Sequence, residues 1–320
     1  MENRSAPRPD PAAARPLAAR LWIYQRERFP VAQYLPMVAA FAFSASSWSR
    51  ACGGRGGFVG RPALLCGMAT SFGLFLLLRL FDEFKDREDD ARYRPYRPVP
   101  RGLVTLGEIR GCILATFAAL VAINAACDAR LLAPLALASA YILLMWREFF
   151  VPRWLRRHPV AYLLSHMLVM PVIDFYATGL DWIHGGEPMP RGLFLFLATT
   201  FLNGCVIEIG RKIRSPEDEE PGVETYSFLW GPRRAAAIWL AVLAATLALA
   251  LACCARTGVL ATAVPLLGFV AAACAEPAVL FLRGRRCGPQ IELASGVWTL
   301  GMYWLVGVLP AATAWWRARG

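Results

Sequence analysis

The stretch "RLFDEFKDREDDARYRPYRPVPRGLV", residues 79–104, follows an apolar run and carries six carboxylates, seven basic side chains and three prolines. Asp82, Asp86 and Asp90 are spaced four residues apart, so they share one helix face if the preceding helix continues past residue 81. Like charges at this spacing destabilise a bare helix, which indicates a functional reason for them. A divalent ion bound by the carboxylates removes the repulsion, and Mg²⁺ is the ion we expect. The alternative is a solvated loop of mixed charge.

Arginines surround these acids. Their planar guanidinium groups suit phosphate oxygens, and the prolines between them restrict the backbone. Carboxylate-bound metal together with arginine is one way to hold a diphosphate. The basic residues assigned to that role in this segment are Arg79, Arg94, Arg97 and Arg101.

The rest of the sequence predicts an all-α polytopic membrane protein. The chain has 320 residues, 57% of them hydrophobic. The apolar residues form blocks of roughly 20, the length of a helix that crosses a bilayer. We expect about nine transmembrane helices bundled around a central cavity, in a single domain over residues 21–320. The predicted helices cover residues 31–49, 62–81, 108–127, 131–150, 160–180, 192–210, 235–255, 258–282 and 292–316.

The distribution of basic residues predicts the orientation. With the N-terminus inside, 24 of the 34 Lys and Arg lie in inner segments and eight in outer ones, as the positive-inside rule requires. We therefore expect a multi-pass protein of the cell inner membrane with a cytoplasmic N-terminus. Residues 1–20, rich in Pro, Ala and Arg, are expected to be a disordered cytoplasmic tail. The net charge of +11 reflects this topology, and we expect no nucleic-acid binding.

A second charged segment, residues 208–231, has the same predicted inner location as the first at 82–104. Glu208 ends the sixth predicted helix, and Lys212 and Arg214 follow it as candidate diphosphate ligands. The two segments divide the chain into halves, as in a weak internal duplication. Asp174 lies in the middle of the fifth predicted helix. An ionisable side chain within the membrane costs free energy, so its presence there indicates a function. His166 lies eight residues earlier, and both could face one cavity.

Taken together, these features resemble the UbiA-type intramembrane prenyltransferase superfamily. That family carries the motif Asn-Asp-x-x-Asp-x-x-x-Asp after its second helix, and "DEFKDREDD" places Asp82, Glu83, Asp86 and Asp90 on its four positions. The following "RPYRPVPRGLVT" resembles the family's arginine-proline stretch. The second motif departs from the family pattern. Aligned on "GVETYS", it puts Asp218 on one acidic position and Arg214 on another.

The resemblance implies a Mg²⁺-dependent enzyme that ionises an allylic prenyl diphosphate and transfers the prenyl group to a lipophilic or aromatic acceptor. Asp82, Glu83, Asp86, Asp90 and Asp218 are then metal ligands. Asp174 or Glu208 is assigned to orient or deprotonate the acceptor. The altered second motif leaves open a terpene cyclase of the same family, which needs no acceptor. A non-catalytic or transport protein is the third alternative.

Overall fold

The computed structural model describes residues 10–220 and 223–317, and every regular element in these ranges is a helix. In the first half these are η1 (Pro11–Ala14), α1 (Leu17–Arg28), α2 (Val31–Cys52), α3 (Arg61–Lys85), α4 (Arg87–Tyr93), α5 (Leu106–Cys127), η2 (Ala129–Leu131), α6 (Leu132–Trp146) and η3 (Glu148–Phe150). Then follow α7 (Pro152–Arg157), α8 (Pro159–Met167), α9 (Val169–Trp182), α10 (Leu193–Gly210), η4 (Pro216–Asp218), α11 (Tyr226–Trp230), α12 (Pro232–Arg256), α13 (Leu260–Leu282), α14 (Gly288–Tyr303), the π-helical turn η5 (Trp304–Val308) and α15 (Leu309–Arg317).

The predicted multi-pass helical fold is confirmed. Within the described residues, eight helical segments are long and apolar enough to cross a membrane. A ninth crossing is added if α1 and α2, which meet at a bend of 63°, form one broken span. Pro30 separates these two helices, and α2 is interrupted further by Pro36. The first predicted span therefore meets the length and hydropathy requirement only when α1 and α2 are taken together.

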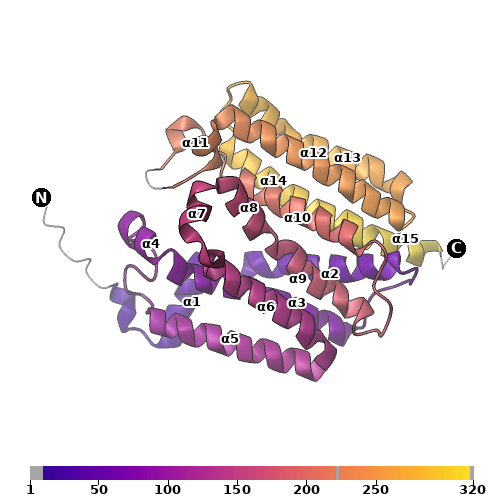
Figure 1. Ribbon diagram of the computed structural model, residues 1–320, viewed down its shortest axis with the longest axis horizontal. Helices are drawn as coiled ribbons and strands as arrows, with labels where there is room; N and C mark the ends of the chain where they lie inside the picture. Colours follow the sequence, from indigo (N-terminus) through magenta and orange to yellow (C-terminus); the bar gives the residue numbers. More distant parts are fainter. Residues whose placement is uncertain (1–9, 221–222, 318–320) are drawn as a thin grey trace, which may run out of the picture.

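The long helices form one bundle (Figure 1). In the first half, α2 packs against α9 and α3 packs against α5; in the second half, α12 lies between α10 and α13. The short helices α4, α7 and α11 gather at one end of the bundle. Because α3 and α10 both end there, the two charged segments that follow them share that end, as the sequence predicts. Inside the bundle, Trp48 and Tyr303 are wholly buried on either side of Phe196.

Two boundaries differ from the expected ones. The helix that was expected to continue through residue 90 ends at Lys85 and restarts as α4, with Asp86 between the two. The fifth predicted span is confirmed as one candidate span, Pro159–Trp182, with an irregular turn at Leu168 between α8 and α9. The fourth ends at Trp146, because the next residues turn back in a left-handed conformation. The interruption at Asp86 changes which carboxylates share a face.

The predicted N-terminal tail is shorter than expected. Residues 1–9 lie outside the described ranges, but η1 and the start of α1 occupy residues 11–20. Asp10 accepts the first backbone N–H of this segment, from Ala12, and pairs with Arg101. Arg20 pairs with Glu108. The expected disorder therefore does not apply to residues 10–20, because ion pairs to the segment 101–108 hold them on the bundle.

Candidate functional site

Two carboxylates at the end of α3 are available for binding. Asp82 has one ion pair, a 3.4 Å contact with Arg79, and its side chain is 43% exposed. Asp86 makes no ion pair with any described residue. Partial burial raises the pKa of Asp86, an effect that the positive charge of Lys85 opposes and the carboxylate of Asp90 reinforces. One helical turn separates the two aspartates, so both face the same region.

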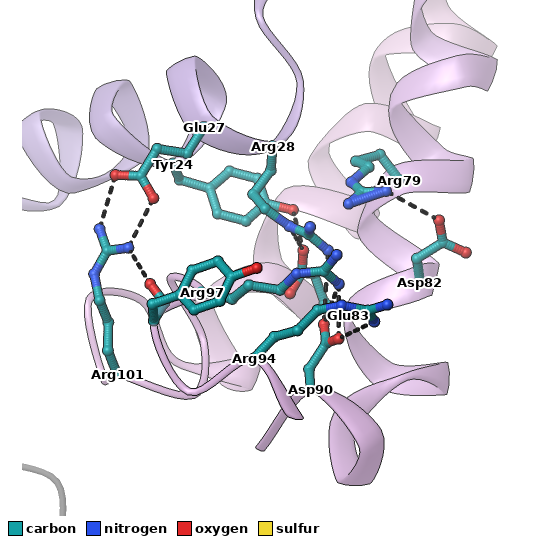
Figure 2. A network of polar contacts seen from close by, with 11 residues as sticks. Tyr24, Glu27, Arg28, Arg79, Asp82, Glu83, Asp90, Arg94, Arg97 and Arg101 are labelled. Atoms are coloured by element: carbon teal, nitrogen blue, oxygen red, sulfur yellow. Dashed lines mark hydrogen bonds and ion pairs between the residues drawn. The ribbon is translucent and has the colours of Figure 1, made fainter. Parts of the chain in front are cut away.

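Glu83 and Asp90, expected to join these two as metal ligands, lie in a different environment (Figure 2). Glu83 accepts a hydrogen bond of 2.7 Å from Arg28 Nε and one of 3.3 Å from the Tyr24 hydroxyl. Asp90 lies 3.8 Å from Arg28 and pairs more closely with two arginines of its own segment. Both carboxylates are buried. Their charges are compensated within the protein, and this arrangement does not support metal binding by either.

The helix break explains this difference. Asp90 belongs to α4, which begins after the interruption at Asp86, so the regular four-residue spacing no longer places it beside Asp82. Glu83 is the neighbour of Asp82 in sequence and therefore points about 100° away around α3. Among the described residues, no group of three His, Cys, Asp or Glu side chains is placed to hold a metal. Two carboxylates are enough for Mg²⁺, which completes its coordination with water and substrate phosphate oxygens.

The arginines predicted to bind diphosphate are divided in the same way. Arg94 and Arg97 donate to Asp90, at 3.1 Å and at 2.6 Å for the closest contacts. Arg101 pairs with Asp10 and Glu27, which raises the pKa of the Arg101 guanidinium through their hydrogen bonds. These three side chains thus hold α1, α4 and the connecting loop together. Arg79 is the one member of the set that faces the available carboxylates.

Basic residues at the end of α10 form the opposite side of the site. Glu208 is buried and pairs with Arg211 and, at 2.9 Å, with Lys212. Burial opposes the charge on Arg211, but the Glu208 carboxylate outweighs it and raises the pKa of Arg211. The Lys212 ammonium lies 5.5 Å from the centre of the Tyr226 ring. Arg211 is close enough to Asp82 for their charges to interact, so the two halves of the bundle meet here.

The remaining part of the second segment turns away from these groups. Arg214 pairs with Glu220 at 2.6 Å, and its backbone N–H donates to the Ser227 hydroxyl. Asp218, predicted as a metal ligand, pairs instead with Arg286 at 2.8 Å and is 45% exposed. The structure therefore brings Glu208 and Lys212 to the site but gives Arg214 and Asp218 other partners.

Asp174 lies deeper in the bundle than the charged groups. It is buried in α9 and accepts a hydrogen bond from Tyr303. His166 was expected to share a cavity with Asp174, but the two have different partners: His166 contacts Lys85, and Asp174 accepts from Tyr303. Asp174 thus has a partner within the protein, the Tyr303 hydroxyl. Its predicted role toward an acceptor remains a prediction.

Sequence reasoning missed a cluster beside the available carboxylates. The Lys85 ammonium lies 2.6 Å from the Tyr162 hydroxyl, 3.2 Å from His166 Nε2 and 3.4 Å from Glu148 Oε1. Glu148, Phe149 and Phe150 have φ of 46°, 52° and 61°, a left-handed run without glycine. Such a backbone costs roughly 1–2 kcal/mol per residue. The sequence signals were His166, which was assigned to a cavity with Asp174, and Lys85 within an acidic run; their proximity was not predictable because the partners of Lys85 are 63 to 81 residues away.

An apolar cavity of about 490 Å³ lies next to the charged groups. It is bounded by α8, α10, α11 and α12, and Trp230 forms part of its wall. Trp230 stacks on Tyr226 at 4.5 Å between ring centres, and Tyr226 in turn lies under Lys212. On the opposite wall, Leu163 follows Tyr162 in the chain. The stacked rings of Trp230 and Tyr226 therefore lie between this wall of the cavity and Lys212.

The comparisons with known proteins agree with this architecture. A model of the UbiA prenyltransferase family matches residues 33–290. An apo UbiA homologue from Aeropyrum pernix K1 superposes with a TM-score of 0.65 at 19% identity, over 86% of this chain and 96% of the other. A digeranylgeranylglyceryl phosphate synthase gives 0.58 at 12% identity, with 91% and 99% covered.

A UbiA homologue from Archaeoglobus fulgidus, solved with GPP and Mg²⁺, gives a TM-score of 0.51 at 14% identity, over 89% of this chain and 98% of the other. A search of the curated proteins found no match. The structural likenesses show a shared fold, and the family match covers most of the sequence. The protein therefore belongs to the UbiA prenyltransferase family, a family of prenyl-transferring membrane enzymes.

Proposed function

We propose that this protein is a Mg²⁺-dependent intramembrane prenyltransferase that moves the prenyl group of an allylic diphosphate to a lipophilic or aromatic acceptor. The observation that carries the proposal is that Asp82, at the end of α3, lies close enough to Arg211, just after α10, for their charges to interact, with Asp86 one turn from Asp82 and Lys212 next to Arg211. Binding a diphosphate with Mg²⁺ requires both carboxylates for the metal and cations for the phosphates. The first half of the chain supplies the carboxylates, and the second half supplies Arg211 and Lys212.

Asp82 and Asp86 are the residues that fit a metal ion. Neither is neutralised by a close ion pair, in contrast with Glu83 and Asp90. When bound there with substrate, Mg²⁺ would supply positive charge to the diphosphate and make it a better leaving group. The homologue from Archaeoglobus fulgidus, solved with GPP and Mg²⁺, supports this use of the site.

The basic side chains at the site stabilise the same negative charge. As the C–O bond of the allylic diphosphate breaks, charge develops on the bridging oxygen and the leaving diphosphate. Arg79, Arg211 and Lys212 are the cations placed to meet it. Arg211 and Lys212 share the buried Glu208 as their partner, so these two cations are held in position before the substrate arrives. Electrostatic stabilisation by groups fixed in advance requires little reorganisation during the reaction.

The allylic cation that forms must be shielded from water until the acceptor captures it. Aromatic ring faces stabilise a nearby cation, and the rings of Tyr162 and Tyr226 lie at the site. The apolar cavity beside Trp230 offers room for hydrocarbon. We place this end of the bundle, with the N-terminus, on the cytoplasmic side of the inner membrane because the basic residues concentrate there.

The test uses the purified protein in lipid nanodiscs with dimethylallyl, geranyl, farnesyl and geranylgeranyl diphosphates. Diphosphate release is followed with Mg²⁺ and with EDTA. We expect release to require Mg²⁺ and to fall by about 100-fold or more in Asp86→Asn, the range seen when a charge-stabilising group is removed. Asp89→Asn, an exposed neighbour, is the matched control and should retain activity.

Two results would contradict the proposal. One is the absence of Mg²⁺-dependent release with all four diphosphates. The other is equal activity of the Asp86→Asn and Asp89→Asn variants. Product analysis separates the reactions within the family. Prenylated acceptor supports the transferase, whereas cyclic hydrocarbon formed without acceptor identifies a terpene cyclase and replaces the proposal.

A further inference from the structure

We propose that the apolar cavity bounded by α8, α10, α11 and α12 binds an acyl chain of an anionic bilayer phospholipid, whose phosphate pairs with Arg234. This lipid is a resident ligand and not a substrate, so the inference goes beyond the proposed reaction and does not depend on it. The cavity has a volume of about 490 Å³, within the range of about 300–1,000 Å³ typical of small-ligand sites. Among the described residues, Arg234 is the only charged one that lines it.

One side of the cavity faces outward from the bundle. Leu164 on α8 is 42% exposed and Ile238 on α12 is 39% exposed, whereas Leu163 and Ile209 on the inner side are buried. Both α8 and α12 belong to segments that are long and apolar enough to cross a membrane, so the exposed side chains face lipid. An acyl chain of the bilayer therefore reaches the cavity without crossing water or the interior of the protein.

Positive charge is concentrated where the cavity meets the end of the bundle. Arg234 lies in the first turn of α12, beside α11 (Figure 1), where the helix N-terminus also favours an anion. It is exposed, and no described residue forms an ion pair or a hydrogen bond with its guanidinium. Residues 151–160 and 226–238, which lead into the two walls, contain no carboxylate and five arginines: Arg153, Arg156, Arg157, Arg233 and Arg234. A surface of this charge attracts an anionic headgroup in preference to a zwitterionic one.

The cation and the apolar walls follow one another along α12. Ile238 and Val242 line the cavity four and eight residues after Arg234, so the three side chains share one face of the helix. Exposed aromatic side chains mark the depth of the headgroups, because large aromatic residues concentrate at the membrane–water interface. Trp154 on α7 is 51% exposed and Phe228 on α11 is 71% exposed. Since α7 precedes α8 and α11 precedes α12, Arg234 lies at headgroup depth and the apolar walls lie at acyl-chain depth.

A prenyl diphosphate also joins an anionic head to a hydrocarbon chain, but the cavity is set apart from the diphosphate site. The stacked rings of Trp230 and Tyr226 lie between its wall and Lys212. Neither Asp82 nor Asp86 lines it, so a headgroup at Arg234 meets no metal-binding carboxylate. A phosphodiester carries a single negative charge and binds arginine without a metal. The hydrocarbon for which the cavity has room is therefore a lipid acyl chain.

The test measures lipid binding to the full-length protein, delipidated in detergent, by native mass spectrometry. Phosphatidylglycerol and phosphatidylcholine with identical acyl chains are titrated separately, and the dissociation constant of the first bound lipid is determined. We expect wild-type protein to bind phosphatidylglycerol about tenfold more tightly, equivalent to about 1.4 kcal/mol. Arg234→Gln should weaken phosphatidylglycerol binding by about fivefold, equivalent to about 1 kcal/mol. Arg233→Gln changes an exposed neighbour that does not line the cavity and should weaken it by less than about twofold.

A second pair of variants tests the cavity itself. Ile238→Trp places a large ring in the cavity and should remove the preference for phosphatidylglycerol. Val264→Trp adds the same ring at an exposed position of α13 that does not line the cavity, and it should bind lipid as the wild-type protein does.

Equal affinity of wild-type protein for the two lipids overturns the inference, and this measurement requires no variant to fold. A preference that survives in Ile238→Trp, or equal losses in Arg233→Gln and Arg234→Gln, overturns the assignment to this cavity. Competitive displacement of phosphatidylglycerol by geranyl S-thiolodiphosphate with Mg²⁺ would assign the cavity to the substrate instead. Simultaneous binding of both supports a resident lipid, and failure of the diphosphate analogue to bind counts against the proposed function alone.

Discussion

Arg28 on α1 donates to Glu83 on α3 across 2.7 Å, and both side chains are buried. This contact joins the N-terminal helix to the helix that carries Asp82 and Asp86. Removing one partner of a buried ion pair leaves the other charge uncompensated, at a cost of about 3–5 kcal/mol. We expect Arg28→Met to lower the thermal unfolding temperature markedly, measured by fluorescence-detected size exclusion. Arg26→Met changes an exposed side chain of the same helix and should have little effect. Equal stability of the two variants would contradict the buried pair.

Lys212 and Arg214 lie two residues apart and should differ in effect. Lys212 pairs with the buried Glu208 and lies over Tyr226, whereas Arg214 pairs with Glu220, which is 60% exposed. An exposed ion pair contributes about 0–1 kcal/mol. Lys212→Met should therefore weaken Mg²⁺-dependent binding of geranyl S-thiolodiphosphate by tenfold or more, and Arg214→Met by less than threefold. A larger loss of binding in Arg214→Met than in Lys212→Met would instead place the diphosphate beside Arg214.

The third prediction concerns Asp218, which the family motif assigns to metal binding and the structure pairs with Arg286. If the structural partner is the relevant one, Asp218→Asn leaves the Mg²⁺ concentration for half-maximal diphosphate release unchanged within about twofold. Asp86→Asn should abolish that Mg²⁺ response. A several-fold rise in the required Mg²⁺ for Asp218→Asn would show that Asp218 leaves Arg286 to bind metal.

Asp10 gives a pH prediction outside the membrane-spanning segments. Its hydrogen bond with Arg101, together with the N–H of Ala12, lowers the pKa of Asp10 below its ordinary value of about 3.9. Its contribution to stability is therefore complete above that value and is lost as the pH falls through the lower folded pKa. We expect the hydrogen-exchange protection factor of the Ala12 amide to fall over that acidic range. Asp10→Ala, which has no side-chain acceptor, should show low protection at every pH, and a wild-type profile in that variant would argue against the contact.

Much of the architecture was predictable, because apolar runs of membrane-spanning length determine where helices lie. The same distribution of basic residues that predicted the topology placed both charged segments at one end. The break at Asp86 was not predictable, because nothing in the local sequence stops the helix there. The break accompanies the burial of Asp90 against Arg28, a residue 62 positions earlier in the chain. The spacing of residues within one helix gives no information about a partner so far away in the chain.

The left-handed turn at Glu148 could not be predicted from the local sequence either. Positive φ is expected at glycine, and "REFF" contains none. The contact that the turn makes, between Glu148 and Lys85, joins residues 63 positions apart in the chain. The same holds for Asp218, whose position in the motif matched the family while its side chain turned to Arg286. Motif position predicted the fold of the segment better than it predicted the contacts of individual side chains.

The buried contact between Arg28 and Glu83 also sets an order for biogenesis. The two residues are 55 positions apart, so the ribosome finishes α1 well before it makes the carboxylate that neutralises Arg28. At 5–20 residues per second the delay is roughly 3–11 s. During that interval the arginine has no partner on α3 and must stay at the water-exposed surface. The N-terminal helix can therefore dock through this pair only after α3 has been synthesised, so the pair forms after α1 and not together with it.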